Sequence, residues 1–289
     1  MRITIALACM LIVGNMCSSK AQGVLDAPCP KTGNVNNNVA IKSHIINRTP
    51  TPYPQVREAD IMWEKWVWRT IDMREKMNHG FYYPFEPTNN RANLLTAIRC
   101  GIANGVVTPY SSIDDEFMVP MTREEALGIG TRTDTLQIPD LYNPEILHDT
   151  VITSTLNPKD VMEYHLKEIW FFDKQRSVMD VRIVGIAPVR IVIDPATGEV
   201  KGKQEMFWLY FPQLRNVLAI YRAFNRNNNA DILTYDDVFF KRMFGSYVYK
   251  ESNPFDRRIT DYALGMNAML ESERIKTDII NFEQDLWDW

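Results

Sequence analysis

The sequence predicts an α+β fold, in which an antiparallel β-meander packs with several amphipathic helices and is preceded by an extended N-terminal arm. Residues 168–211 alternate apolar and polar side chains between short polar turns, a pattern typical of antiparallel strands. The segments on both sides of this region repeat apolar residues at helical spacing. Helices on both sides of a contiguous antiparallel sheet are typical of the α+β class.

The chain starts with the pattern of a cleavable signal peptide. Arg2 precedes an apolar run over residues 3–13, which is shorter than the ~20 residues that a membrane-spanning helix needs. A small-residue site comes next, so we expect cleavage between Ala21 and Gln22. A lipid-modified Cys17 is the alternative, which we disfavour because the residues before it lack the leucine and small-residue pattern of lipoprotein signals.

The mature chain is expected to be acidic and globular. Removal of residues 1–21 takes away two basic residues and no acid, which leaves 30 basic against 36 acidic residues and a net charge of −6. Nucleic-acid binding is therefore not expected, because phosphate contacts draw on clustered Lys and Arg in a basic protein. The composition, 45% hydrophobic and 24% charged, is that of an ordinary folded protein with one large core or two small ones.

Residues 22–55 form the predicted arm, and residues 56–289 form the predicted α+β domain. The arm is rich in Asn, Thr and Pro and has almost no periodic apolar pattern, so it cannot bury enough surface to fold alone. Two interpretations stay open, a mobile linker or a tail that docks on a neighbouring subunit. The arm carries Cys29, one of the two cysteines that remain in the mature chain.

The domain is predicted to be organised around an amphipathic helix over Asp60–Asn78. Trp63, Trp66 and Trp68 lie within six residues, and helical geometry places the apolar side chains on one broad arc and most charged ones opposite. The simpler interpretation is that all three tryptophans are core residues. The functional interpretation is that Trp68, which lies off the main apolar stripe, contacts a partner protein.

A second helix is predicted over residues 91–104 and is closed by Gly105. Cys100 lies off the apolar face of this helix. Two interpretations are open for it, a buried thiol or a disulfide with Cys29 outside the cytoplasm.

Local signals assign most of the remaining elements before the meander. Short strands are predicted at 106–110 and 114–120, and Thr122 opens a short helix through a capping box. Residues 131–155 carry no clear pattern and are left unassigned. Asn157 followed by proline predicts a helix that runs to Lys167.

The meander and the C-terminal part complete the domain. The predicted strands of the meander are residues 168–173, 177–194 and 203–211. The remaining predicted elements are a helix from Pro212, a helix capped by Thr234 and Asp237, a strand at 246–250, and two helices between Ile259 and the end.

The sequence contains no motif for catalysis or for cofactor binding. It has no Gly-rich phosphate loop, no Gly-x-Ser-x-Gly turn, and no His or Cys residues at metal-ligand spacing. Residues 225–236 resemble a calcium loop in their Asn and Asp spacing, but Ala230 stands where a Gly is needed and Asp236 where a Glu is needed. We therefore expect no enzyme activity, no metal and no cofactor.

Several collinear runs carry a family resemblance. They are Asp60–Trp63 with Ile71–Lys76, Phe172–Arg176 with Val181–Pro188, Phe239–Tyr247, Ile259–Tyr262, and Glu273–Lys276 with Leu286–Trp287. Together they resemble the GldN/PorN family of gliding-motility and type IX secretion proteins, from about Ala59 onward. The arm lies outside the resemblance.

The resemblance implies a non-enzymatic structural component of the type IX protein secretion and gliding machinery in the periplasm of a Bacteroidetes-type cell. It implies self-association in a ring complex with a GldK- or PorK-like lipoprotein, held peripherally at the inner face of the outer membrane. A GldM- or PorM-like motor protein is the second implied partner. The alternative is a free periplasmic ligand-binding protein or hydrolase, which would be a monomer with a closed small-molecule pocket.

Overall fold

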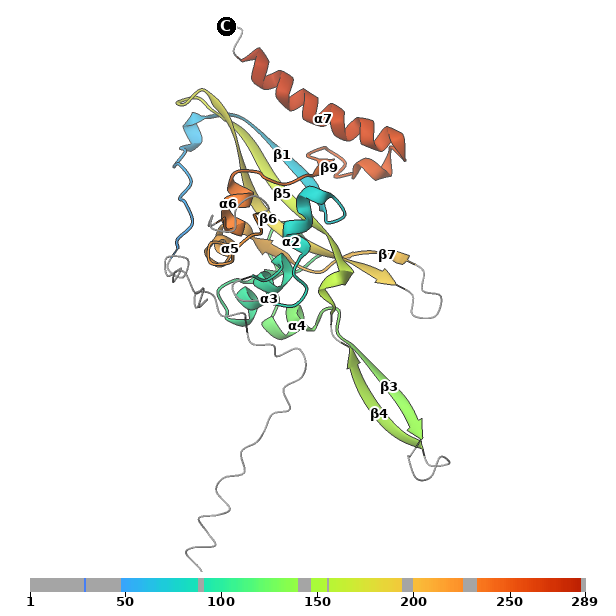
Figure 1. Ribbon diagram of the computed structural model, residues 1–289. Helices are drawn as coiled ribbons and strands as arrows, with labels where there is room; N and C mark the ends of the chain where they lie inside the picture. Colours follow the sequence, from blue (N-terminus) through green and yellow to red (C-terminus); the bar gives the residue numbers. More distant parts are fainter. Residues whose placement is uncertain are drawn as a thin grey trace, which may run out of the picture.

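Figure 1 shows the computed structural model of the chain. It describes residue 29 and residues 48–87, 91–139, 147–154, 156–193, 200–225 and 233–286. The predicted cleavage site at Ala21 and Gln22 and most of the predicted arm lie outside these residues.

A seven-stranded antiparallel sheet forms the centre of the described chain. Its strand order is β2-β8-β6-β5-β1-β9, and β7 pairs with the same long strand β6. The bounds are β1 Ile61–Asp72, β2 Pro109–Tyr110, β5 Val161–Asp173, β6 Val178–Ile193, β7 Val200–Glu205, β8 Trp208–Tyr210 and β9 Tyr247–Glu251. The first two strands of the predicted meander correspond to β5 and β6, whereas the third, predicted over 203–211, is divided into β7 and β8, which both pair with β6.

A separate two-stranded hairpin covers most of the segment that the sequence left unassigned. It consists of β3 (Arg132–Pro139) and β4 (Leu147–Ser154), paired from Arg132 opposite Ser154 to Pro139 opposite Leu147. Figure 1 shows this hairpin extending away from the rest of the protein.

The helices are short except for the last one. Their bounds are α2 His79–Tyr82, α3 Leu94–Ala103, α4 Arg123–Gly128, α5 Phe211–Leu218, α6 Tyr235–Phe240 and α7 Met266–Asp285, with single 3-10 turns at η3 Glu58–Asp60, η4 Lys76–Asn78, η5 Pro158–Asp160 and η6 Ile259–Asp261. The Thr122 and Thr234 side chains both complete the predicted capping boxes. The α+β fold class is confirmed. Of the two helices predicted after Ile259, the first is only the turn η6, whereas the second is the long helix α7.

The predicted helix over Asp60–Asn78 is wrong, because most of this segment is the strand β1. Along β1, Val67 is paired with Glu168 of β5 and with Glu251 of β9, so the strand is internal to the sheet. Both faces of its second half are also covered, by the core and α7 on one side and by the layer around Trp68 on the other, which removes the simple alternation that would have marked a strand. Tryptophan and β-branched side chains also favour a pleated surface over a helix.

The predicted helix over Asn157–Lys167 is also wrong beyond its first turn. Asn157 caps the turn η5 by accepting a hydrogen bond from the Lys159 N–H, as the sequence indicated. The chain then enters β5, which pairs along its length with β1 on one side and β6 on the other. The local capping signal is therefore correct, but pairing with two neighbouring strands makes the next residues extended.

Two hydrophobic clusters lie on one face of β1. Ile71 belongs to the main core with helices α3, α5 and α6, whereas Val67 packs with Ile275 and Ile279 of α7. These two β1 residues are separated by four positions and therefore share a face of the strand. The opposite face carries Trp66 and Trp68.

The described end of the arm is held against its own domain. Arg48 forms an ion pair with Asp237 of α6 at 2.7 Å. The Tyr53 ring lies 4.2 Å from the Arg215 guanidinium and stacks on Phe240 with centroids 5.9 Å apart. This end of the arm is therefore a fixed part of the structure around α5 and α6.

Candidate interaction surfaces

The tryptophans of β1 lie in a layer of aromatic rings and paired charges. The Trp68 Nε1–H donates to an Asp115 carboxylate oxygen at 2.5 Å. Lys167 Nζ donates to the Asp115 carbonyl at 2.9 Å and lies 5.1 and 5.5 Å from the centres of the Trp66 and Trp68 rings. Lys250 Nζ lies 4.4 Å from the centre of the Trp68 ring.

Only 7% of Trp68 is exposed, so its side chain does not present an open surface. Its polar atom and its ring are occupied by Asp115, Lys167 and Lys250. The predicted partner contact at Trp68 stays a prediction, and it would require the segment that carries Asp115 to move. This burial supports the simpler interpretation of Trp68 as a core residue.

A histidine–carboxylate pair lies further along the same face. His165 Nδ1 is 3.0 Å from a Glu205 carboxylate oxygen, and the Arg258 guanidinium donates to the same oxygen at 3.0 Å. Burial acts to raise the pKa of Glu205. The hydrogen bond from His165 and the charges of His165 and Arg258 outweigh this effect, so the pKa lies below its ordinary value. Because His165 is 8% exposed and its partner is shared with Arg258, the geometry fits a structural link between β5, β7 and the segment after β9.

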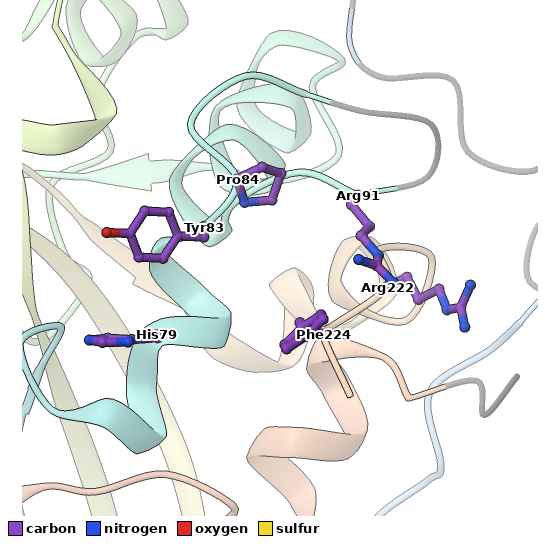
Figure 2. A pocket seen from close by; sticks show the side chains of 6 residues that line it. All are labelled: His79, Tyr83, Pro84, Arg91, Arg222 and Phe224. Atoms are coloured by element: carbon purple, nitrogen blue, oxygen red, sulfur yellow. The ribbon is translucent and has the colours of Figure 1, made fainter. Parts of the chain in front are cut away.

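A pocket of about 310 Å³ opens beside α2 (Figure 2). Its lining residues are His79, Tyr83, Pro84, Arg91, Arg222 and Phe224. The Arg91 guanidinium lies 5.2 Å from the centre of the Phe224 ring, and the rings of His79 and Tyr83 meet edge to face at 5.9 Å.

The pocket walls are fixed from behind by a buried tyrosine. The Tyr235 hydroxyl is 2.7 Å from the Ala92 carbonyl and 3.1 Å from the Gly80 carbonyl. Burial raises the pKa of Tyr235, so it remains a neutral donor. The lining combines aromatic rings with cationic side chains and includes no acid, which suits an aromatic or acidic group rather than a metal ion. Across the part of the chain that the structure describes, no group of three or more His, Cys, Asp and Glu side chains is placed to hold a metal.

Helix α7 buries one face on the sheet and exposes several large apolar residues on the opposite face. Its inner face packs Ile275 and Ile279 on the sheet, and Phe282 stacks on Trp63 with ring centroids 4.6 Å apart. Its outer face carries four large apolar residues that are 52–71% exposed: Met266, Met269, Leu270 and Ile280. Helical geometry places these four positions on one side of the helix. We refer to these four residues as the outer stripe.

Met266, Met269 and Leu270 cluster in the first turns of the helix, and exposed Glu273 and Thr277 separate them from Ile280 on the same side. An exposed apolar cluster of this kind is typical of an interaction site. The spacing of these apolar residues along the helix is visible in the sequence alone, so sequence reasoning could have found this surface. The pocket could not be found in that way, since its residues come from the separate segments 79–91 and 222–224.

The structure joins Cys29 to Cys100 in a disulfide, with the two Cα atoms 5.6 Å apart. This separation lies within the usual range for disulfides. Cys100 is buried although it lies off the apolar face that the sequence indicated, since α3 is buried on nearly all sides. Cys29 packs against the main core at this point and so ties the arm to α3.

The sequence was compared with models of known protein families. The sequence model of "Gliding motility associated protein GldN" matches residues 56–288. The chain belongs to the GldN family. This confirms the resemblance found in the sequence. A search of curated proteins gave no match.

The GldN match includes β1, the pocket beside α2 and the whole of α7. It begins directly after the docked segment around Tyr53, so Cys29 and the arm lie outside the matched region. The loop that resembles a calcium site is largely outside the described residues, but Asp236 is described and forms an ion pair with Arg215 at 2.7 Å. Asp236 is therefore engaged within the protein.

Proposed function

We propose that this chain is a non-enzymatic structural component of the type IX secretion and gliding machinery. In this proposal it self-associates in a ring with a GldK- or PorK-like lipoprotein at the inner face of the outer membrane. It also contacts a GldM- or PorM-like motor protein from the periplasmic side. Membership of the GldN family supports the association with gliding motility, and the outer stripe of α7 is the structural observation that supports assembly.

The outer stripe supports assembly because its exposure is costly in a free protein. Met269 and Leu270 are 68% and 61% exposed, although neighbouring turns of the same helix bury isoleucines completely or nearly so. Covering apolar surface stabilises a complex by about 25 cal/mol per Å² before the costs of association. The charged pairs elsewhere on the described surface offer no comparable driving force, because exposed ion pairs contribute little.

The proposed location depends on the expected signal peptide and on the lipoprotein partner. Within the residues that the structure describes, no helix is long and apolar enough to cross a membrane. In the proposal, the lipoprotein provides the peripheral attachment, and the chain itself supplies protein-binding surfaces.

The proposal is tested by native mass measurement of the complex extracted from cells in mild detergent. We expect an assembly of many copies that contains the lipoprotein. A variant with Met269→Lys and Leu270→Lys should lose this assembly, because two charges would be placed in the covered surface. Asn267→Lys is the matched control, since Asn267 is exposed on the same helix but lies off the outer stripe. Extracts that contain only the free monomer would support the ligand-binding protein or hydrolase instead.

A further inference from the structure

We propose that the pocket beside α2 binds the segment Trp287–Trp289 of a second copy of this chain. The inference rests on the proposed self-association and names the contact that would produce it. It draws on two observations, which are the chemistry of the pocket and the position of the C-terminal end of α7.

The pocket and the segment are complementary in chemistry. The pocket presents the rings of Phe224 and Tyr83 together with the cationic Arg91 and Arg222 (Figure 2). The segment Trp287–Trp289 has the sequence Trp-Asp-Trp, so it offers two indoles and a carboxylate. An indole can stack on rings and guanidinium groups, and the acid can pair with an arginine.

Both arginines also make other interactions within their own protomer. The proposal needs only that cationic side chains line the pocket, as both arginines do. The Arg91 guanidinium lies over the Phe224 ring, whereas Figure 2 shows the Arg222 guanidinium directed away from that ring. A volume of about 310 Å³ is large enough for one indole side chain. Tryptophan and arginine are also the residues that most often dominate the binding energy of protein interfaces.

The segment cannot reach the pocket of its own protomer. Phe282, near the end of α7, stacks on Trp63 close to the start of β1. The pocket begins at the other end of β1, where the Asn78 side chain, next to His79, donates to the Asp72 carbonyl at 2.7 Å. From Trp63 to Asp72 the extended strand spans roughly 30 Å, at about 3.3 Å per residue.

A chain of three residues beyond Leu286 extends by at most about 11 Å. Figure 1 shows the end of α7 directed away from α2, which increases the gap. Only the pocket of another copy is therefore accessible to Trp287–Trp289. Such a contact joins two different surfaces of the same chain, so it is head-to-tail and repeats from copy to copy. It forms a ring where the rotation between copies closes, as the proposed assembly requires, and an open filament otherwise.

The contact can be measured directly with a labelled peptide of residues 281–289. We expect it to bind the full mature protein and to bind Phe224→Ala roughly thirtyfold more weakly, as for an interface residue worth about 2 kcal/mol. A peptide with Ala at positions 287 and 289 is the matched control and should not bind. Circular dichroism of Phe224→Ala checks that the variant is folded. Equal binding of the peptide to the parent protein and to Phe224→Ala would overturn the proposal.

Mixing two variants tests whether the contact is head-to-tail. One variant carries Trp287→Ala and Trp289→Ala and keeps the pocket, and the other carries Phe224→Ala and keeps the tail. Each alone should fail to self-associate, whereas the mixture should form pairs that stop at two subunits, as measured by native mass. Assemblies of normal size from either variant alone would refute this role of the pocket while leaving the lipoprotein complex intact. A monomeric parent protein in cell extracts, by contrast, would refute the proposed function even if the peptide bound.

Discussion

The buried ion pair between Arg215 and Asp236 gives the sharpest test of how the domain is held together. Arg215 Nε lies 2.7 Å from one carboxylate oxygen of Asp236, and a terminal guanidinium nitrogen lies 3.1 Å from the other. The two side chains are 6% and 5% exposed. Arg215 also donates to the Thr51 carbonyl at 2.6 Å and lies against the Tyr53 ring. The pair therefore links α5, α6 and the arm.

Asp236→Ala should be strongly destabilising, because it leaves the Arg215 charge buried without its carboxylate. Removing one partner of a buried pair costs about 3–5 kcal/mol. For a domain of this size, each kcal/mol lowers the melting temperature by about 2–4 °C, so the expected fall is roughly 6–20 °C. Urea unfolding monitored by far-UV circular dichroism measures the free energy, and a thermal scan measures the melting temperature.

Two further variants separate the cost of leaving Arg215 buried without a partner from the cost of losing an ion pair as such. The double variant Arg215→Met with Asp236→Leu should recover most of the stability, since apolar residues of similar volume replace both charges. Asp278→Ala removes a partner of Arg274 in an exposed pair and should cost less than about 1 kcal/mol. A loss below about 1 kcal/mol for Asp236→Ala would refute the argument, and so would a double variant as unstable as the single one.

The disulfide, the Asp173 carboxylate in the turn after β5 and the packing of α7 give three more predictions. In a protein that starts at Gln22, Cys29→Ala should lower the free energy of unfolding by about 4 kcal/mol, the chain-entropy value for a loop of this length. A thiol count under non-reducing conditions should then find one free cysteine, Cys100, in place of none. Arg176 donates a hydrogen bond to Asp173 and holds the pKa of that carboxyl below its ordinary value. Asp173→Asn should therefore be less stable than the parent above about pH 4, and the difference in the free energy of unfolding should vanish as the pH falls through the lowered pKa. Urea titrations at several pH values measure this difference, and a difference that stays constant with pH would contradict the prediction. Ile275→Ala, at a fully buried site, should cost about 2–5 kcal/mol and speed hydrogen exchange in α7, whereas unchanged exchange would show that α7 is held in another way.

Helix caps and tight turns specified by residues close together in the sequence were predicted correctly. Thr122 and Thr234 each accept a hydrogen bond from an N–H three residues later, so four consecutive residues carry the whole signal. The turn between β5 and β6 is equally local, since Asp173 accepts from the backbone N–H groups of Gln175 and Arg176. Such signals do not depend on where the rest of the chain lies.

The segment around Trp63 shows where local reasoning fails. Its apolar residues satisfy helical spacing, but they satisfy a strand equally well once both faces are covered. Trp63 packs toward α7, whereas Trp66 and Trp68 lie in the layer around Lys167 on the opposite face. Pairing with β5 decides between helix and strand, and the residues of β5 lie about one hundred positions later in the sequence. No short window of sequence contains that information.

Helix α7 shows what the sequence holds about assembly. Ile275 and Ile279 form one apolar face, whereas Met266, Met269 and Leu270 form a second apolar cluster on the opposite side of the first turns, with Ile280 further along that side. A single domain with one sheet covers only one of them, and the structure shows that it covers the isoleucine face. Only contact with another molecule can then cover the exposed apolar residues. Because the end of α7 also points away from the pocket of its own protomer, contact with another protein chain accounts for both features together.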